Sequence, residues 1–206
     1  MMRKFNKHIA IPALTVLTVF MLMVYTSCNK KQDDSNMGVC ANVVCYNEGR
    51  CIDGKCNCIS GFEGTQCQTD SRDRYLGSWE VSEIVKGSSN ASNIGKTRSY
   101  TFTIKKSDVA NTAVRFDNLS GNGMYNNILA YVGRKYNPDT KDYNVDITTN
   151  FCFVAVQGVS ATSTLINGGN GYVNNLSTLL AGTYYIQYPD NGKTVLDTVS
   201  FSADHL

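Results

Sequence analysis

The sequence predicts a mainly β protein, in which a small cysteine-rich module precedes a larger antiparallel β domain. Six cysteines fall within residues 40–67, whereas residues 71–206 hold one cysteine, few charges and many Thr, Val, Tyr and Asn residues. Those residue types favour strands. Apolar and polar residues alternate over 100–105 and over 143–148, which is typical of strands with one buried face.

Residues 1–27 have the composition of a secretory signal peptide. Basic residues precede an apolar run over 9–25, and the small residues Thr26 and Ser27 come before Cys28. The run is close to the roughly 18 apolar residues of a membrane-spanning helix, so a retained anchor is the alternative. Pro12 and the small residues favour cleavage.

Thr26-Ser27-Cys28 resembles the lipobox of bacterial lipoproteins, with Tyr25 standing where that family usually carries Leu, Val or Ile. The resemblance implies that the Cys28 thiol receives a diacylglyceryl group and that the new amino terminus is acylated by a fatty acid such as palmitate. Each buried CH2 contributes about 0.8 kcal/mol, so several chains bind a membrane firmly. We therefore expect a chain anchored through Cys28 rather than one that spans.

Residues 28–38 are expected to form a lipidated, flexible tether, because they contain little apolar surface to bury. The sequence Lys31-Gln32-Asp33-Asp34 is similar to short acidic signals that send some Gram-negative lipoproteins to the outer face of the outer membrane. A solvated linker is the alternative. The expected location is the outer membrane, with exposure at the cell surface.

Residues 39–69 contain six cysteines with the spacing C-x4-C-x5-C-x4-C-x-C-x8-C. So short a module needs disulfides or a metal to fold, and an exported chain favours disulfides. Counting cysteines leaves many connectivities open. A zinc site is the alternative, although the C-x2-C pairs of common zinc modules are absent.

The spacing resembles an EGF-like domain, and Gly61 and Phe62 complete that family's C-x-C-x2-G-[FY] ending. Asp53-Gly54 suits the two-residue turn of a hairpin. The acidic pattern of calcium-binding EGF domains is absent before the first cysteine, so no metal is expected. The resemblance implies the pairs Cys40–Cys51, Cys45–Cys56 and Cys58–Cys67.

Residues 72–206 are predicted to form one β domain. Turn signals at 137–139, 168–171 and 191–192 separate several of its strands. Residues 176–181 are the candidate for a short helix, capped by Asn175 and stopped by Gly182. The candidate strands are 79–85, 100–105, 113–119, 128–136, 143–148, 151–156, 163–166, 171–174, 183–188 and 194–201.

Many short strands in meander order imply a closed barrel or a β-sandwich. Gly77 and Trp79 near the start of the domain resemble the G-x-W motif of lipocalin-like (calycin) barrels. In that family the tryptophan plugs one end of the barrel. The resemblance implies a lipocalin-like barrel, with the β-sandwich as the alternative.

The residue inventory offers little for catalysis. His8 lies in the leader and His205 is the penultimate residue, so histidine-dependent nucleophilic chemistry has almost no material. Residues 90–97 end like a phosphate-binding loop, but Asn90 replaces the first glycine, which favours a surface loop. We expect no catalytic residue, no cofactor and no metal. The spacing of the acidic residues near the 137–139 turn matches no calcium loop; these are Asp139, Asp142 and Asp146.

Two further residue types are assigned to packing. Cys152 lies in an apolar strand and is expected to be a buried thiol. The tyrosines are expected mainly in core and cross-strand contacts, with cavity lining or sugar stacking as the alternative. They are Tyr125, Tyr131, Tyr136, Tyr143, Tyr172, Tyr184, Tyr185 and Tyr188.

These features predict a non-enzymatic lipoprotein at the cell surface that binds a small hydrophobic ligand, a glycan or a protein through its β domain. The alternative is a structural accessory subunit of an outer-membrane complex, docked through the EGF-like module. Nucleic acid is excluded as a partner, because the chain without its basic leader has a slight excess of acidic residues. A sizeable cavity would favour a small ligand, and a filled interior would favour protein or glycan contact.

Overall fold

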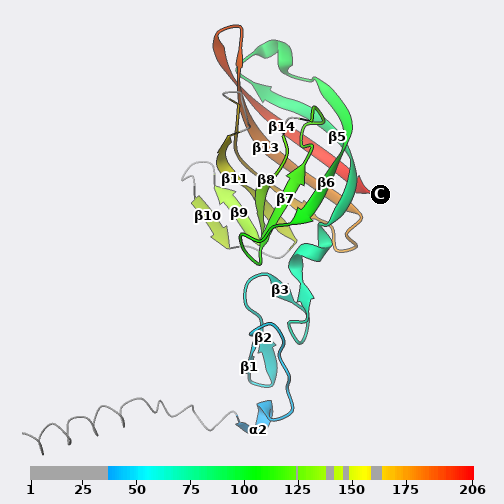
Figure 1. Cartoon of the computed structure of the whole chain (residues 1–206), viewed down its shortest axis with the longest axis vertical. Coiled ribbons are helices and arrows are strands. Elements are labelled where there is room, and N and C mark those ends of the chain that lie inside the picture. Colours follow the sequence, from blue (N-terminus) through cyan, green and yellow to red (C-terminus); the bar gives the residue numbers. More distant parts are fainter. Residues whose placement is uncertain (1–36, 124, 138–141, 146–148, 159–163) are drawn as a thin grey trace, which may run out of the picture. The chain divides into compact units, whose positions relative to one another are not determined.

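The computed structural model describes residues 37–123, 125–137, 142–145, 149–158 and 164–206 (Figure 1). The predicted signal peptide, Cys28, Asp139 and Asp146 lie outside the described residues. The chain divides into two compact units, residues 1–42 and 43–206. Helix α2 (Met37–Cys40) belongs to the first unit. Within the described ranges, no helix has both the length and the apolar character needed to cross a membrane.

The cysteine-rich module of the second unit consists of two small hairpins. Strand β1 (Arg50–Ile52) pairs antiparallel with β2 (Lys55–Asn57), and β3 (Phe62–Glu63) pairs with β4 (Thr69–Asp70). The β1–β2 turn is the predicted Asp53-Gly54 pair, with φ angles of 50° and 77°. Both residues of such a turn need positive φ, which glycine and aspartate tolerate.

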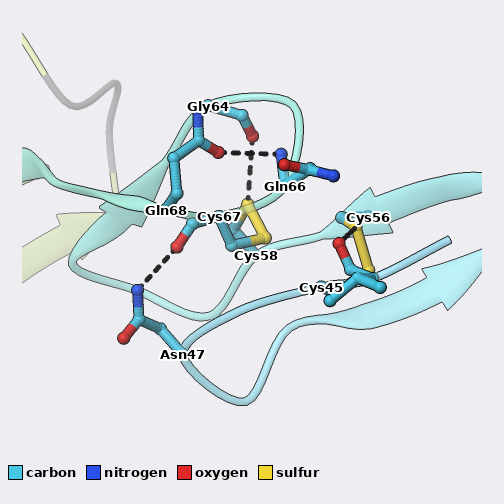
Figure 2. Close-up of a disulfide and its surroundings, with 9 residues drawn as sticks. Cys45, Asn47, Cys56, Cys58, Gly64, Gln66, Cys67 and Gln68 are labelled. Atoms are coloured by element: carbon cyan, nitrogen blue, oxygen red, sulfur yellow. Dashed lines mark hydrogen bonds between the residues drawn. A yellow bond between two sulfur atoms is a disulfide. The ribbon is translucent and has the colours of Figure 1, made fainter.

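Two of the predicted disulfides are confirmed. Cys45 and Cys56 are bridged with their Cα atoms 5.6 Å apart, and Cys58 and Cys67 with theirs 5.3 Å apart (Figure 2). Cys40 and Cys51 are also disulfide-bonded, as the predicted pairing requires. The N-terminal region therefore holds three disulfides in place of an apolar core.

Side-chain amides secure the loops around these bridges. Asn47 Nδ2 donates to the Cys67 carbonyl at 2.7 Å, and the Gln66 N–H donates to Gln68 Oε1 at 3.0 Å (Figure 2). The main chain adds a bond from the Tyr46 N–H to the Gln66 carbonyl. Hydrogen bonds thus join residues 46–47 to residues 66–67.

The larger domain is a closed antiparallel barrel, which confirms the predicted barrel and excludes the sandwich (Figure 1). Among the described residues, eight strands close in the order β11-β12-β13-β14-β5-β6-β7-β8. Closure occurs because β14 pairs with β13 on one side and with β5 on the other. The strands are β5 (Gly77–Ser88), β6 (Thr97–Lys106), β7 (Ala113–Asp117), β8 (Ile128–Val132), β11 (Asn150–Gly158), β12 (Leu165–Val173), β13 (Leu179–Asp190) and β14 (Lys193–His205).

Shorter elements connect the barrel strands. The 3-10 helix η2 (Ser71–Arg74) leads into β5, and η3 (Ala91–Asn93) lies between β5 and β6. The predicted strand 128–136 is divided at Gly133, whose φ is 70°, into β8 and β9 (Arg134–Asn137). Strand β9 pairs with β10 (Asp142–Val145) in a separate two-stranded sheet.

Charged side chains join the module to the end of β6. Arg72 Nη2 and Lys106 Nζ lie 2.7 and 2.9 Å from Asp70 Oδ2, and Arg72 also donates to the carbonyls of Ser107 and Ala110. Burial alone would raise the pKa of Asp70, but hydrogen bonds from Arg72 and Lys106 outweigh it and lower the pKa to about 2. The carboxylate therefore stays charged across the physiological range.

The G-x-W residues lie at this same end of the barrel. Trp79 is fully buried, its Nε1 donates to the Tyr75 carbonyl at 2.9 Å, and its ring meets the His205 ring edge-on at 4.7 Å between centroids. Gly77 has a φ of 116°, and a Cβ there would lie 2.8 Å from His205 Nε2. Only glycine accepts both the backbone angle and the close imidazole.

Aromatic rings fill the half of the lumen nearest to Trp79. Phe102 packs against Phe116 at 5.2 Å and against Phe201 at 5.9 Å, and Phe116 packs against Phe153 at 4.9 Å. All four rings are buried. The two contacts of Phe102 are edge-to-face, an arrangement that stabilises a core beyond the area that it buries.

Two predictions about the C-terminal half are wrong. Residues 168–171 do not form a turn, because β12 runs through them with a register shift between Ile166 and Gly169. A Cβ on Gly171 would lie 2.3 Å from Phe151 Cζ and 2.6 Å from the Ala181 carbonyl. These glycines therefore permit a close approach within the sheet rather than a reversal of the chain.

The predicted helix over 176–181 is also absent. Asn174 Oδ1 accepts hydrogen bonds from the Thr178 and Leu179 N–H groups, at 2.8 and 3.2 Å, and closes a tight loop. Leu179 then begins β13. The side chain of Asn174 thus gives these two N–H groups a local acceptor in place of the backbone carbonyls of a helix.

Substitution of Gly171 by alanine is expected to destabilise the barrel by about 2 kcal/mol, because the new methyl group collides with the Phe151 ring. Gly87→Ala is the matched control, since a Cβ there meets Thr198 at an ordinary 3.7 Å. Denaturant unfolding measures both free energies. Equal stability of the two variants would contradict the packing account.

Candidate functional site

A cavity of about 600 Å³ opens at the end of the barrel opposite to Trp79. The strand register places it there, because Trp79 pairs with His205 whereas Ser88 pairs with Asp197 near the other end of the same two strands. The wall comes from β5, β6, β13, β14 and the connections between strands. The lining residues are Val85, Asn93, Lys96, Thr97, Arg98, Asn122, Tyr125, Thr164, Ile186, Tyr188, Pro189 and Asp197.

Two carboxylates take inward positions that strand alternation would normally give to apolar residues. Glu83 stands between the buried Val81 and Val85 on β5. Asp197 stands between the buried Val195 and Val199 on β14. Each carboxylate residue is only 4% exposed, so each must find its partners within the protein.

The Glu83 carboxylate has both hydrogen-bond donors and a cationic partner. Tyr100 and Tyr184 donate their hydroxyls to Glu83 Oε2 at 2.7 and 2.9 Å. Arg98 Nε forms an ion pair with Glu83 Oε1 at 2.7 Å, although that oxygen makes no hydrogen bond. Burial raises the pKa of Tyr100 and that of Tyr184, so both phenols keep the protons that they donate.

Asp197 accepts the last bond of a hydrogen-bond chain that begins at the Lys96 ammonium and passes through two neutral side chains. Lys96 Nζ donates to Asn93 Oδ1 at 2.7 Å, Asn93 Nδ2 donates to the Tyr188 hydroxyl at 2.7 Å, and Tyr188 donates to Asp197 Oδ2 at 2.9 Å. Burial, and then the bond to Asp197, raise the pKa of Tyr188 to about 12. In the described part of the chain, the buried Asp197 Oδ1 has no hydrogen-bond partner.

The rest of the wall combines apolar and aromatic residues with the polar Thr97, Asn122 and Thr164. Val85 and Ile186 are buried, and Tyr125 and Pro189 complete the apolar part of the wall. Lys96 and Arg98 are exposed residues of the lining. The cavity therefore offers an apolar body, an acidic position within it and basic residues that reach solvent.

The residues singled out from the sequence lie in different parts of the structure, and only some of them line the cavity. Gly77 and Trp79 lie at the start of β5, away from the cavity. Cys152 is buried and is not in a disulfide. Residues 90–97 form a loop with η3, as expected, but they also contribute Asn93 and Lys96 to the cavity wall.

The tyrosines divide between packing and the cavity. Tyr184 belongs to the core, Tyr125 and Tyr188 line the cavity, and Tyr172 is exposed. The side chains of Tyr136 and Tyr143 lie outside the described part of the structure. Core packing is thus confirmed for some of the set, while the alternative of cavity lining applies to others.

Sequence reasoning missed Glu83, Asp197 and Arg98. A signal was present, because an acidic residue at every-second-residue spacing with valines, as in Val81-Ser82-Glu83-Ile84-Val85, breaks the apolar face of a strand. The same break occurs at Asp197. Reading such breaks as inward polar groups would have located the site.

No protein-family model matches the chain, and no curated protein matches it either. Among the residues that the structure describes, no three His, Cys, Asp or Glu side chains come together as a candidate metal site. The interpretation of the cavity therefore depends on its own geometry and charges.

Replacing Arg98 by alanine is expected to destabilise the protein by about 2 kcal/mol, because it leaves Glu83 buried without its cation. Lys105 lies on the same strand as Arg98 and forms an exposed ion pair with Asp117 on β7. Lys105→Ala should therefore lower the free energy of unfolding by no more than about 0.5 kcal/mol. Chemical denaturation followed by tryptophan fluorescence compares the two. Similar losses would show that burial of Glu83 is unimportant.

Proposed function

We propose that this chain is a non-enzymatic binding lipoprotein, held at the outer membrane through lipid on Cys28 and exposed at the cell surface, whose barrel receives a small ligand. The observation that carries the proposal is the cavity of about 600 Å³ at the mouth of the barrel. Ligand sites in proteins measure roughly 300–1,000 Å³ and combine apolar walls with a few convergent polar groups. The lining described above has both.

The packing of the lumen limits the kind of ligand. Phe102, Phe116, Phe153 and Phe201 occupy the half nearest to Trp79, so the ligand does not enter the full depth of the barrel. A compact molecule with one polar end fits the remaining volume better than a long acyl chain. Of the expected small hydrophobic ligand, glycan and protein, we therefore propose the small molecule.

The lining favours binding over catalysis. Nucleophilic catalysis needs a nucleophile and a base within hydrogen-bond reach of each other. Among the described residues that line the cavity, the hydroxyl groups other than phenols are those of Thr97 and Thr164, and no histidine lies in the lining to act as their base. His205 lies at the opposite end, where its ring packs on Trp79. The tyrosines hold their protons because burial raises the pKa of Tyr188 and that of Tyr125.

Mass spectrometry of the N-terminal peptide from the native protein tests the anchor. We expect the peptide to begin at Cys28 and to carry a diacylglyceryl thioether and an amide-linked acyl chain. Treatment of intact cells with protease should remove the barrel domain if it is surface-exposed. An unmodified Cys28 would refute the anchor, and protection from protease would refute surface exposure.

Filling the cavity tests ligand binding. Native mass spectrometry of the protein purified from its own membranes should detect a bound small molecule, and Ile186→Trp should abolish it by occupying the volume. Leu196→Trp is the control, because Leu196 is 46% exposed on the adjacent strand and adds the same ring outside the barrel. A thermal melt checks that both variants fold. A wild-type protein without a bound molecule, or a folded Ile186→Trp variant that keeps it, would contradict the proposal.

A further inference from the structure

We infer that the ligand carries a cationic group, an organic ammonium, which pairs with Asp197. The inference rests on the proposed function and concerns the chemistry of the same cavity. It follows from a difference in partners between the two inward carboxylates, Glu83 on β5 and Asp197 on the neighbouring strand β14.

Glu83 shows what a buried carboxylate requires in this lumen. It has two tyrosine donors and the Arg98 cation at 2.7 Å. Asp197 is equally buried, yet it has one tyrosine donor and no ion pair among the described residues. A buried charge is costly unless it is both paired and hydrogen-bonded. Asp197 is hydrogen-bonded but has no cation beside it in the described structure, and a cationic ligand supplies that cation.

The hydrogen-bond chain that reaches Asp197 runs in one direction. Lys96 donates to Asn93, Asn93 donates to Tyr188, and Tyr188 donates to Asp197 Oδ2. The chain therefore ends on an acceptor, and Oδ1 accepts nothing in the described structure. The Asp χ2 torsion is soft, so a small rotation presents either oxygen to the cavity. Only a donor can satisfy that free oxygen, and an ammonium brings a charge as well.

The two basic residues of the lining do not make an equivalent site for an anion. Arg98 is paired with Glu83, and Lys96 is bonded to Asn93. Both residues are exposed, so water already solvates them. An anion drawn into the cavity would also meet Asp197, whose like charge repels it.

Aromatic and apolar residues complete a site for such a cation. The rings of Tyr125 and Tyr188 line the same cavity as Asp197, and ring faces attract ammonium groups. Val85 and Ile186 offer apolar contact for the body of the ligand. The geometry points to a small amphipathic amine, with its ammonium at Asp197.

The test uses three probes that differ only in their polar group: phenethylamine, 2-phenylethanol and phenylacetate. Calorimetric titration of the full-length lipoprotein in mild detergent should give the amine a Kd about tenfold or more below that of the alcohol. The reason is that a hydrogen bond between an ammonium and a carboxylate is stronger than one that involves a neutral hydroxyl. Phenylacetate should bind most weakly. Asp197→Asn should remove the preference for the amine, whereas Asp204→Asn, which neutralises an exposed residue on the same strand, should keep it.

The comparison among probes needs only the wild-type protein, so it decides the matter even if Asp197→Asn fails to fold. Equal binding of the alcohol and the amine, or tighter binding of phenylacetate, overturns the cation site while leaving a small-ligand function in place. Absence of binding by all three probes also overturns it, and the cavity-filling experiment then decides the broader function separately. A folded Asp197→Asn variant that still prefers the amine overturns the role of Asp197.

Discussion

The pairing of β14 with β5 is the contact on which the rest of the domain depends. It joins the last strand of the chain to the first strand of the barrel, from Asp197 and Ser88 to His205 and Trp79. Without it the sheet would have two open edges, each with unpaired backbone groups. The same pairing brings the two inward carboxylates onto neighbouring strands and seats the His205 ring on Trp79. Barrel closure, the contact of Trp79 with His205 at one end and the position of Asp197 near the other are thus consequences of one strand register.

Along that register the lumen changes character. Near Trp79 it is filled by rings that need no polar partner, and beyond Tyr184 it contains carboxylates, phenols and an amide that depend on one another. Tyr184 belongs to both regions, because its ring packs against Phe153 while its hydroxyl donates to Glu83. The aromatic half supplies stability from packing. The polar half is more costly to bury and is therefore the part whose chemistry indicates a function.

Much of the architecture could be predicted from local sequence patterns. Cysteine spacing indicated the small module, and the Asp53-Gly54 pair indicated its hairpin. Alternation with turn residues indicated a barrel or a sandwich, and the G-x-W resemblance favoured the barrel that is observed. The failures arose where tertiary contacts override local preference. Gly171 is required by the ring of Phe151 across the sheet, and Asn174 bonds the chain ahead of it rather than beginning a helix. The candidate site was harder to predict, because Asp197 and Asn93 are 104 positions apart in the printed sequence and meet only after closure.

The ion pairs around Asp70 fix which end of the barrel strands the second hairpin of the module meets. They attach this hairpin beside Lys106, Ser107 and Ala110, at the end of the barrel nearest to Trp79. The open mouth is therefore at the far end of the barrel strands from that module. On the proposal that the cavity holds a small ligand, residues 43–70 would stand outside the path between that cavity and solvent.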